Sequence, residues 1–103
     1  MTVYDIAQIE RDGFNLILVP VNPLVGVRQP KQQQEFRLHI ERCAELAGLS
    51  GLVVPVWRGY TGKIKFIAPD ELSEVLFGLE WPMIAKHLNH KLACPEAPAF
   101  QPA

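Results

Sequence analysis

The stretch GLVVPVWRGYTGKIKFIAP, residues 51–69, holds two apolar runs on either side of a short Gly-containing loop. Residues 51–57 are almost wholly apolar, and residues 63–68 alternate two lysines with an isoleucine and a phenylalanine, which is typical of a strand with one wet face. Residues 58–62 (RGYTG) separate the two runs. This pattern predicts a β-hairpin with an exposed tip.

The segments before the hairpin predict a parallel unit. Residues 14–21 (FNLILVPV) are nearly continuous in apolar and β-branched residues, as in a strand that is covered on both faces. Residues 22–30 hold two prolines and a glycine and predict a loop. A helix is predicted from Pro30 or Lys31 to Gly48, because apolar residues recur there at helical spacing. A strand, a helix and a second strand in one sheet make the two strands parallel.

Three more helices are predicted from apolar spacing. Residues 2–12 place four apolar side chains near helical spacing, and Gly13 follows as a helix terminator. Residues 69–79 predict a helix that is capped by Asp70. Residues 81–93 (WPMIAKHLNHKLA) predict a last helix with a proline in its first turn.

These elements together predict a small two-layer α/β (α+β) domain. Its core would have the order β-α-β-β-α-α, with a three-stranded mixed sheet and helices packed on it. Residues 1–94 are expected to form this single domain. Residues 95–103 contain three prolines and are expected to form a flexible tail.

The composition of the 103-residue chain is that of a globular protein. Hydrophobic residues make up 49%, charged residues 20%, and the net charge is −1, which makes nucleic acid an unlikely partner on bulk electrostatics. The longest apolar runs fall short of the roughly 18 residues that cross a bilayer, so no membrane is expected. The charged start of the chain does not resemble a signal peptide, and a cytoplasmic location with reduced cysteines is predicted.

Metal, cofactor and catalytic signals are weak in this sequence. His39 and Cys43 stand at i, i+4, and His87, His90 and Cys94 at i, i+3, i+7, which are spacings that metal ligands can have. No CxxC or HExxH pattern accompanies them, and Cys43 falls on an apolar helix face, so no metal or cofactor is predicted. No nucleophile stands in a triad-like context, so enzymatic activity is not favoured and no catalytic residue is assigned.

The end of the predicted parallel strands is the expected place for a small ligand. Ligands of open sheets gather beyond the carboxyl ends of parallel strands. The residues that this topology would bring there are Asn22, Arg28, Trp57, Arg58 and Tyr60. Two guanidinium groups beside an aromatic wall suit a carboxylate or phosphate, so binding of a small anionic ligand is one hypothesis.

The favoured hypothesis is a binding or interaction domain, because a small chain rich in apolar residues tends to leave apolar surface for a partner. It would act as a homodimer, through the edge of residues 63–68 or an uncovered sheet face, or as a subunit that docks on another protein. The expected surface comprises Trp57, Tyr60, Lys63, Lys65 and Trp81. A third hypothesis is single-stranded nucleic acid on the same lysines and aromatic residues.

Overall fold

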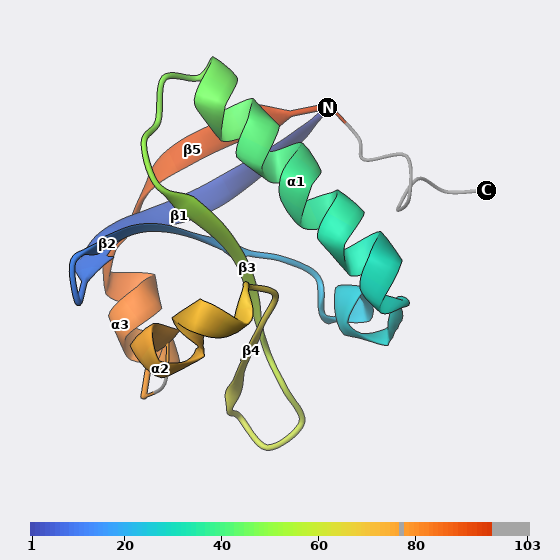
Figure 1. Cartoon of the computed structure of the whole chain (residues 1–103), viewed down its shortest axis with the longest axis vertical. Helices are drawn as coiled ribbons and strands as arrows, with labels where there is room; N and C mark the ends of the chain where they lie inside the picture. Colours follow the sequence, from blue (N-terminus) through green and yellow to red (C-terminus); the bar gives the residue numbers. More distant parts are fainter. Residues whose placement is uncertain (77, 96–103) are drawn as a thin grey trace.

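The computed structural model describes residues 1–76 and 78–95 of the chain. The strands are β1 (Thr2–Arg11), β2 (Phe14–Pro20), β3 (Leu52–Arg58), β4 (Ile64–Phe66) and β5 (Leu88–Cys94). The α-helices are α1 (Pro30–Leu46), α2 (Ser73–Leu76) and α3 (Trp81–Lys86), and two 3-10 helices are η1 (Pro23–Val27) and η2 (Asp70–Leu72). The strands form one mixed sheet in the order β4-β3-β2-β1-β5 (Figure 1).

The centre of the sheet follows the predicted parallel unit. β2 pairs with β3 in parallel, and β3 pairs with β4 in the antiparallel sense. The predicted helix from Pro30 is confirmed as α1, which connects the two parallel strands. Pro20 is the last residue of β2. Pro55 lies inside β3. Its carbonyl oxygen accepts a hydrogen bond from Ile67 N at 3.0 Å, just beyond the end of β4. The N–H that proline lacks therefore falls at the place where the pairing of β3 with β4 ends.

Helices cover both faces of the sheet, so the predicted two-layer arrangement is wrong (Figure 1). β2 shows why, because its four central residues alternate between two cores and all are buried. Ile17 and Val19 pack in the core under α1, with Phe36 and Ile40. The other core contains Leu16, Leu18, Val54 and Val56 of the sheet and Leu72, Val75, Leu76, Leu79 and Ile84 of the opposite helical segments.

The sheet has five strands where three were predicted, and the first extra strand is β1. Residues 2–12 were predicted as a helix, but residues 2–11 form β1, which pairs with both β2 and β5. A register shift between Ile6 and Ala7 lies in its pairing with β5. Ile6 and Ala7 are both fully buried, Ile6 in one core and Ala7 in the other. Two adjacent apolar residues break the alternation of a half-exposed strand, and this made the sequence resemble that of a helix.

The second extra strand replaces most of the predicted last helix. That helix ends at Lys86, and Leu88–Cys94 forms the edge strand β5 against β1. Leu92 and Cys94 face the α1 core from this strand. The predicted helix over residues 69–79 is also broken up, into η2 and the single turn α2.

The two cysteines are joined, which corrects the prediction of reduced thiols. Cys43 of α1 and Cys94 of β5 form a disulfide with a Cα–Cα distance of 5.7 Å and a sequence separation of 51. The prediction rested on the expected cytoplasmic location alone and did not consider where the fold places the two cysteines. As a strand residue, Cys94 is fully buried and faces α1.

Two further predictions concern the ends of the chain and the membrane. The predicted flexible tail of residues 95–103 lies, except for Pro95, outside the described residues. Across the described part of the chain, no helix has both the length and the apolar character needed to cross a bilayer.

Candidate functional site

A groove of about 610 Å³ lies between the β3–β4 hairpin and the segment that leads into α3. We call it the hairpin groove. Its described lining comprises Arg58, Thr61, Gly62, Lys63, Ile64 and Phe66 of the hairpin and Leu76, Gly78, Leu79, Glu80, Trp81 and Pro82 opposite. Ile64, Phe66 and Trp81 also pack against the core on this side of the sheet. The groove therefore has an apolar floor that continues into the core and charged groups among its lining residues.

Arg58 reaches the groove through the alternation of β3. Val54 and Val56 are buried in the core beside α2 and α3, so Arg58, two residues further along, emerges on the same face at the end of the strand. Its guanidinium carbon lies 5.7 Å from the centre of the Trp81 ring. A guanidinium over an indole face is a cation–π contact, which holds this charge at the groove.

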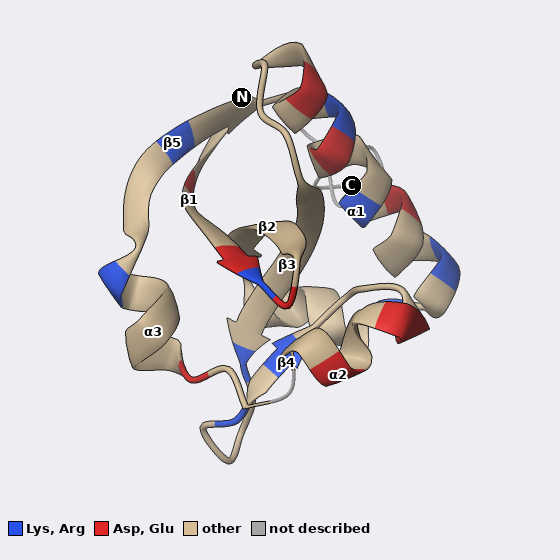
Figure 2. Ribbon diagram, turned by 60° about the vertical axis from the view of Figure 1, so that its left-hand side comes forward, with Lys and Arg blue, Asp and Glu red and all other residues tan. Residues whose placement is uncertain are grey.

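The hairpin supplies a second cation at a fixed place. Gly62 N donates to Gly59 O at 3.0 Å, and Gly59 N donates to Lys63 O at 2.8 Å, so the loop is closed by backbone hydrogen bonds. Gly62 has a φ of 81°, a conformation that favours glycine. The lining of the groove therefore carries Arg58 and Lys63 against Glu80. Lys and Arg gather on the hairpin, whereas Asp and Glu mark α2 (Figure 2).

Trp57 lies on the opposite face of the sheet from Arg58. Its indole packs against the α1 core, and a Cβ atom built on Gly26 would come within 2.9 Å of its ring. Lys65 pairs with Trp57 across the hairpin and therefore shares that face. The structure thus divides the predicted interaction residues, placing Lys63 and Trp81 at the hairpin groove and Trp57 and Lys65 on the far side.

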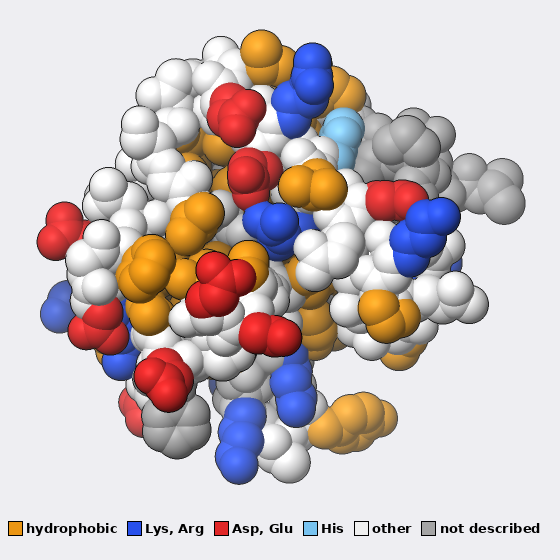
Figure 3. Space-filling view, viewed as in Figure 1, with side chains coloured by type: hydrophobic (Ala, Val, Ile, Leu, Met, Phe, Trp, Pro, Cys, Tyr) orange, Lys and Arg blue, Asp and Glu red, His pale blue; other side chains and the backbone are white. Residues whose placement is uncertain are grey.

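The remaining predicted ligand residues do not converge on the groove lining. Asn22 caps η1, where its Oδ1 accepts from Leu24 N at 2.9 Å. Arg28 follows η1 at its C-terminal end. Tyr60 stands at the hairpin tip and is fully exposed. Hydrophobic and basic side chains adjoin at the lower end of the molecule in Figure 3, where Figure 1 places the hairpin.

Sequence reasoning missed the side of the groove that residues 78–82 provide. These residues were placed at a junction between two helices, and only Trp81 was singled out among them. A signal was available in the Gly78 to Pro82 segment, where a glycine and a proline interrupt two apolar runs. A glycine and a proline in so short a segment favour irregular backbone, and an irregular segment beside a sheet can form one wall of a groove.

A second cavity, of about 510 Å³, lies between β1 and α3. Its described lining includes Ile9, Arg11, Met83 and His87. Nδ1 of His87 lies 2.9 Å from Met83 O, so this imidazole already forms a hydrogen bond with a carbonyl of α3. The hairpin groove, by contrast, combines two cations with an aromatic ring at one opening.

One cluster of side chains combines residue types that bind metal ions, although its two cysteines are joined in a disulfide. Single ligand atoms of His39, Cys43 and Cys94 lie within 4.8 Å of one another. The spacing in the sequence grouped His39 with Cys43, and it grouped Cys94 with His87 and His90 instead. The β5 strand is what brings Cys94 to α1.

Comparison with known proteins gives no relative of this chain: no family model, no curated protein and no solved structure matches it.

Proposed function

We propose that the protein is a small binding domain that docks an acidic segment of a partner protein in the hairpin groove. The observation that carries the proposal is the pairing of Arg58 with Trp81 at 5.7 Å beside an open groove of about 610 Å³. Arginine and tryptophan are among the residue types that are enriched in binding hot spots. Lys63 adds a second positive charge to the same lining.

The occupant follows from the lining. A carboxylate can accept two parallel hydrogen bonds from the exposed guanidinium of Arg58, and such charge-assisted pairs are among the stronger polar contacts. An apolar side chain next to that carboxylate would cover Ile64 and Phe66 on the floor. A groove that is open between a hairpin and a loop favours an extended peptide over a fully enclosed compound.

Two alternatives make different use of this surface. A small anionic ligand would use the same cations, and no residue of the described lining is assigned a role in its turnover. Single-stranded nucleic acid would need the aromatic side chains on one side, whereas Trp57 and Trp81 lie on opposite faces of the sheet. As part of the same proposal we place the domain in the cytoplasm, a reducing compartment in which the Cys43–Cys94 disulfide would be open to reduction.

An acidic peptide is expected to bind at the hairpin groove at least tenfold more weakly when Arg58 is replaced by Ala. A hydrogen bond to a charged group contributes about 1.5–3 kcal/mol, which is a factor of about ten or more in affinity. The probe is a fluorescein-labelled peptide of alternating Glu and Leu, and the measurement is fluorescence anisotropy at low ionic strength. Lys63→Ala should weaken binding in the same direction.

The control is Lys31→Ala, which removes an exposed charge from the first turn of α1, outside the groove lining. It should leave the affinity unchanged. Equal binding of a peptide with Lys in place of Glu would rule out the proposal, as would an Arg58→Ala variant with wild-type affinity. Full displacement of the peptide by millimolar citrate or inorganic phosphate would favour the small-anion alternative.

Self-association is a second candidate, and one observation favours it. β5 is an edge strand of seven residues with one hydrogen-bonded neighbour, β1, among the described strands, while the edge β4 has only three residues. A longer unpaired edge is the better template for pairing across a two-fold axis. Light scattering across a dilution series should then give twice the chain mass of 11.6 kDa. A constant monomer mass at all concentrations would exclude it.

A further inference from the structure

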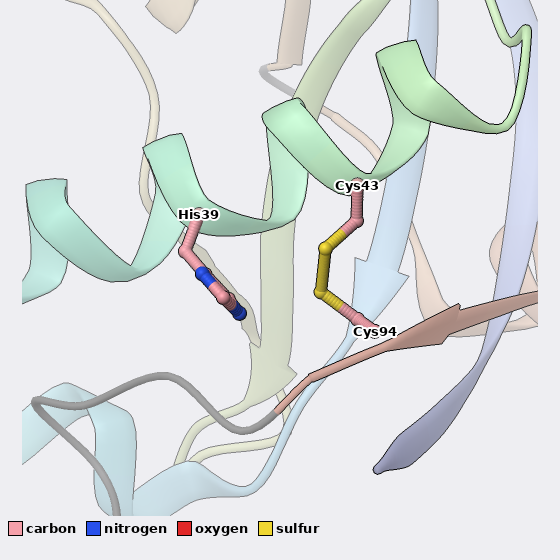
Figure 4. Close-up of side chains that lie close together, drawn as sticks. All are labelled: His39, Cys43 and Cys94. Atoms are coloured by element: carbon pink, nitrogen blue, oxygen red, sulfur yellow. A yellow bond between two sulfur atoms is a disulfide. The ribbon is translucent and has the colours of Figure 1, made fainter.

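Three side chains with nitrogen and sulfur donors converge between α1 and the end of β5 (Figure 4). His39 and Cys43 stand four residues apart on α1, so their side chains lie on one side of the helix. Cys94 meets them from the last residue of β5, and one ligand atom of each lies within 4.8 Å of the others. We call these residues the His-Cys cluster. It lies on the α1 side of the sheet, away from the hairpin groove.

The imidazole of His39 is already held in one tautomer. Its Nε2 lies 2.6 Å from the carbonyl oxygen of Pro95. A carbonyl oxygen can only accept a hydrogen bond, so Nε2 must carry the proton, and in the neutral ring Nδ1 keeps its lone pair. Histidines that bind metals commonly donate their other ring nitrogen to a backbone carbonyl in this way. The contact with Pro95 therefore prepares His39 as a ligand.

The environment of the two sulfur atoms narrows the choice of ion. Cys43 is 8% exposed and Cys94 is fully buried, and both belong to the apolar core under α1. Within the described residues, the donors gathered here are one imidazole and two sulfurs, without a carboxylate. Thiolate and imidazole donors suit zinc, whereas magnesium and calcium prefer oxygen.

We propose that reduction of the Cys43–Cys94 disulfide opens a Zn²⁺ site formed by the two thiolates and the His39 imidazole. A dithiol reductant transfers two electrons and two protons to the disulfide and is itself oxidised to a disulfide. Both cysteines then lose their protons to solvent as the zinc ion binds. Two thiolates on one tetrahedral zinc ion lie about 3.8 Å apart, since each Zn–S bond is about 2.3 Å long. Three protein ligands leave a fourth position for water or a further donor.

Cobalt(II) is the first probe, because it reports thiolate ligands by its absorption. The 103-residue chain is reduced with a phosphine, freed of metal and titrated with Co²⁺. We expect a thiolate-to-cobalt charge-transfer band and the visible bands of tetrahedral cobalt, both saturating at one equivalent and lost on adding one equivalent of Zn²⁺. The oxidised protein should show neither band.

Two histidine variants distinguish cobalt binding at the His-Cys cluster from cobalt binding by other side chains. His39→Ala should weaken cobalt binding at least about tenfold, since loss of a ligand costs no less than loss of an outer-shell partner. His90→Ala removes an exposed histidine of β5 outside the cluster and should have no effect. Unchanged affinity in His39→Ala, or a folded reduced protein without the charge-transfer band, would overturn the proposal.

The folding state of the reduced protein is followed by far-ultraviolet circular dichroism in the same titration. If the metal-free reduced chain is unfolded, refolding with one equivalent of Zn²⁺ supports the site, because metal binding then supplies free energy of folding. Failure to refold with Zn²⁺ contradicts it.

Discussion

Replacing Leu18 by Ala is expected to lower the free energy of unfolding by about 2–5 kcal/mol, the range for leucine deletions in well-packed cores. Leu18 is fully buried in β2, with Ala7 of β1 and Val54 of β3 as its partners in the two neighbouring strands. The sheet on both sides of Leu18 limits how far the structure can collapse into the cavity. Urea unfolding, followed by circular dichroism, gives the free energy from the midpoint and slope.

Leu46→Ala is the matched control for this core substitution. Leu46 ends α1 and is 81% exposed, so the same change of side chain removes almost no buried contact. Its free energy of unfolding should stay within about 0.5 kcal/mol of the wild type. Similar losses for both variants would show that β2 is not the buried centre of the sheet.

Reduction of the Cys43–Cys94 disulfide in the presence of a chelator is expected to lower the free energy of unfolding by about 4 kcal/mol. The bond spans a sequence separation of 51, and an open loop of that size gives the unfolded chain more conformations. This loss is large beside the 5–15 kcal/mol that is typical of native domains. Thermal unfolding with and without a phosphine reductant measures it.

A Cys43→Ala/Cys94→Ala double variant tests whether the effect comes from this bond. Its unfolding should not respond to the reductant, because it has no other cysteine. Coincident unfolding curves for the oxidised and reduced wild-type protein would contradict the prediction. Addition of Zn²⁺ without chelator should restore stability to the reduced wild type if the His-Cys cluster binds the metal.

The centre of the fold could be predicted from sequence because its signals are local. The unbroken apolar run that forms β2, the helical spacing of α1 and the Gly-rich turn of the hairpin each depend on neighbouring residues alone. Once these elements are known, the parallel pairing of β2 and β3 follows from the helix between them.

The outer strands were missed because their apolar residues fall at helical spacing. Leu88 and Leu92 are four residues apart, as on one face of a helix, but in the structure they pack in different cores on opposite faces of the sheet, on either side of a register shift in the pairing with β1. Neither glycine nor proline stands between the end of α3 and the start of β5. In β1, helices over both faces of the sheet bury adjacent residues and hide the alternation of a half-exposed strand.

The candidate sites show the same division. Arg58 and Lys63 could be singled out because the hairpin that carries them is local, and Trp81 followed as an aromatic residue near a helix start. The partnership of Cys43 with Cys94 depends on β5 returning beside β1. A pairing of strands so distant in sequence leaves no periodic signal in either strand alone.

Synthesis from the N-terminus means that β1 is made well before β5, the strand with which it pairs. The ribosome releases β1 long before residues 88–94, so one edge of β1 waits without its native neighbour while the rest of the sheet can form. An open strand edge on a nascent chain is a surface on which chains aggregate. We therefore expect the rate at which residues 67–94 are translated to affect how much of the newly made protein reaches the closed sheet.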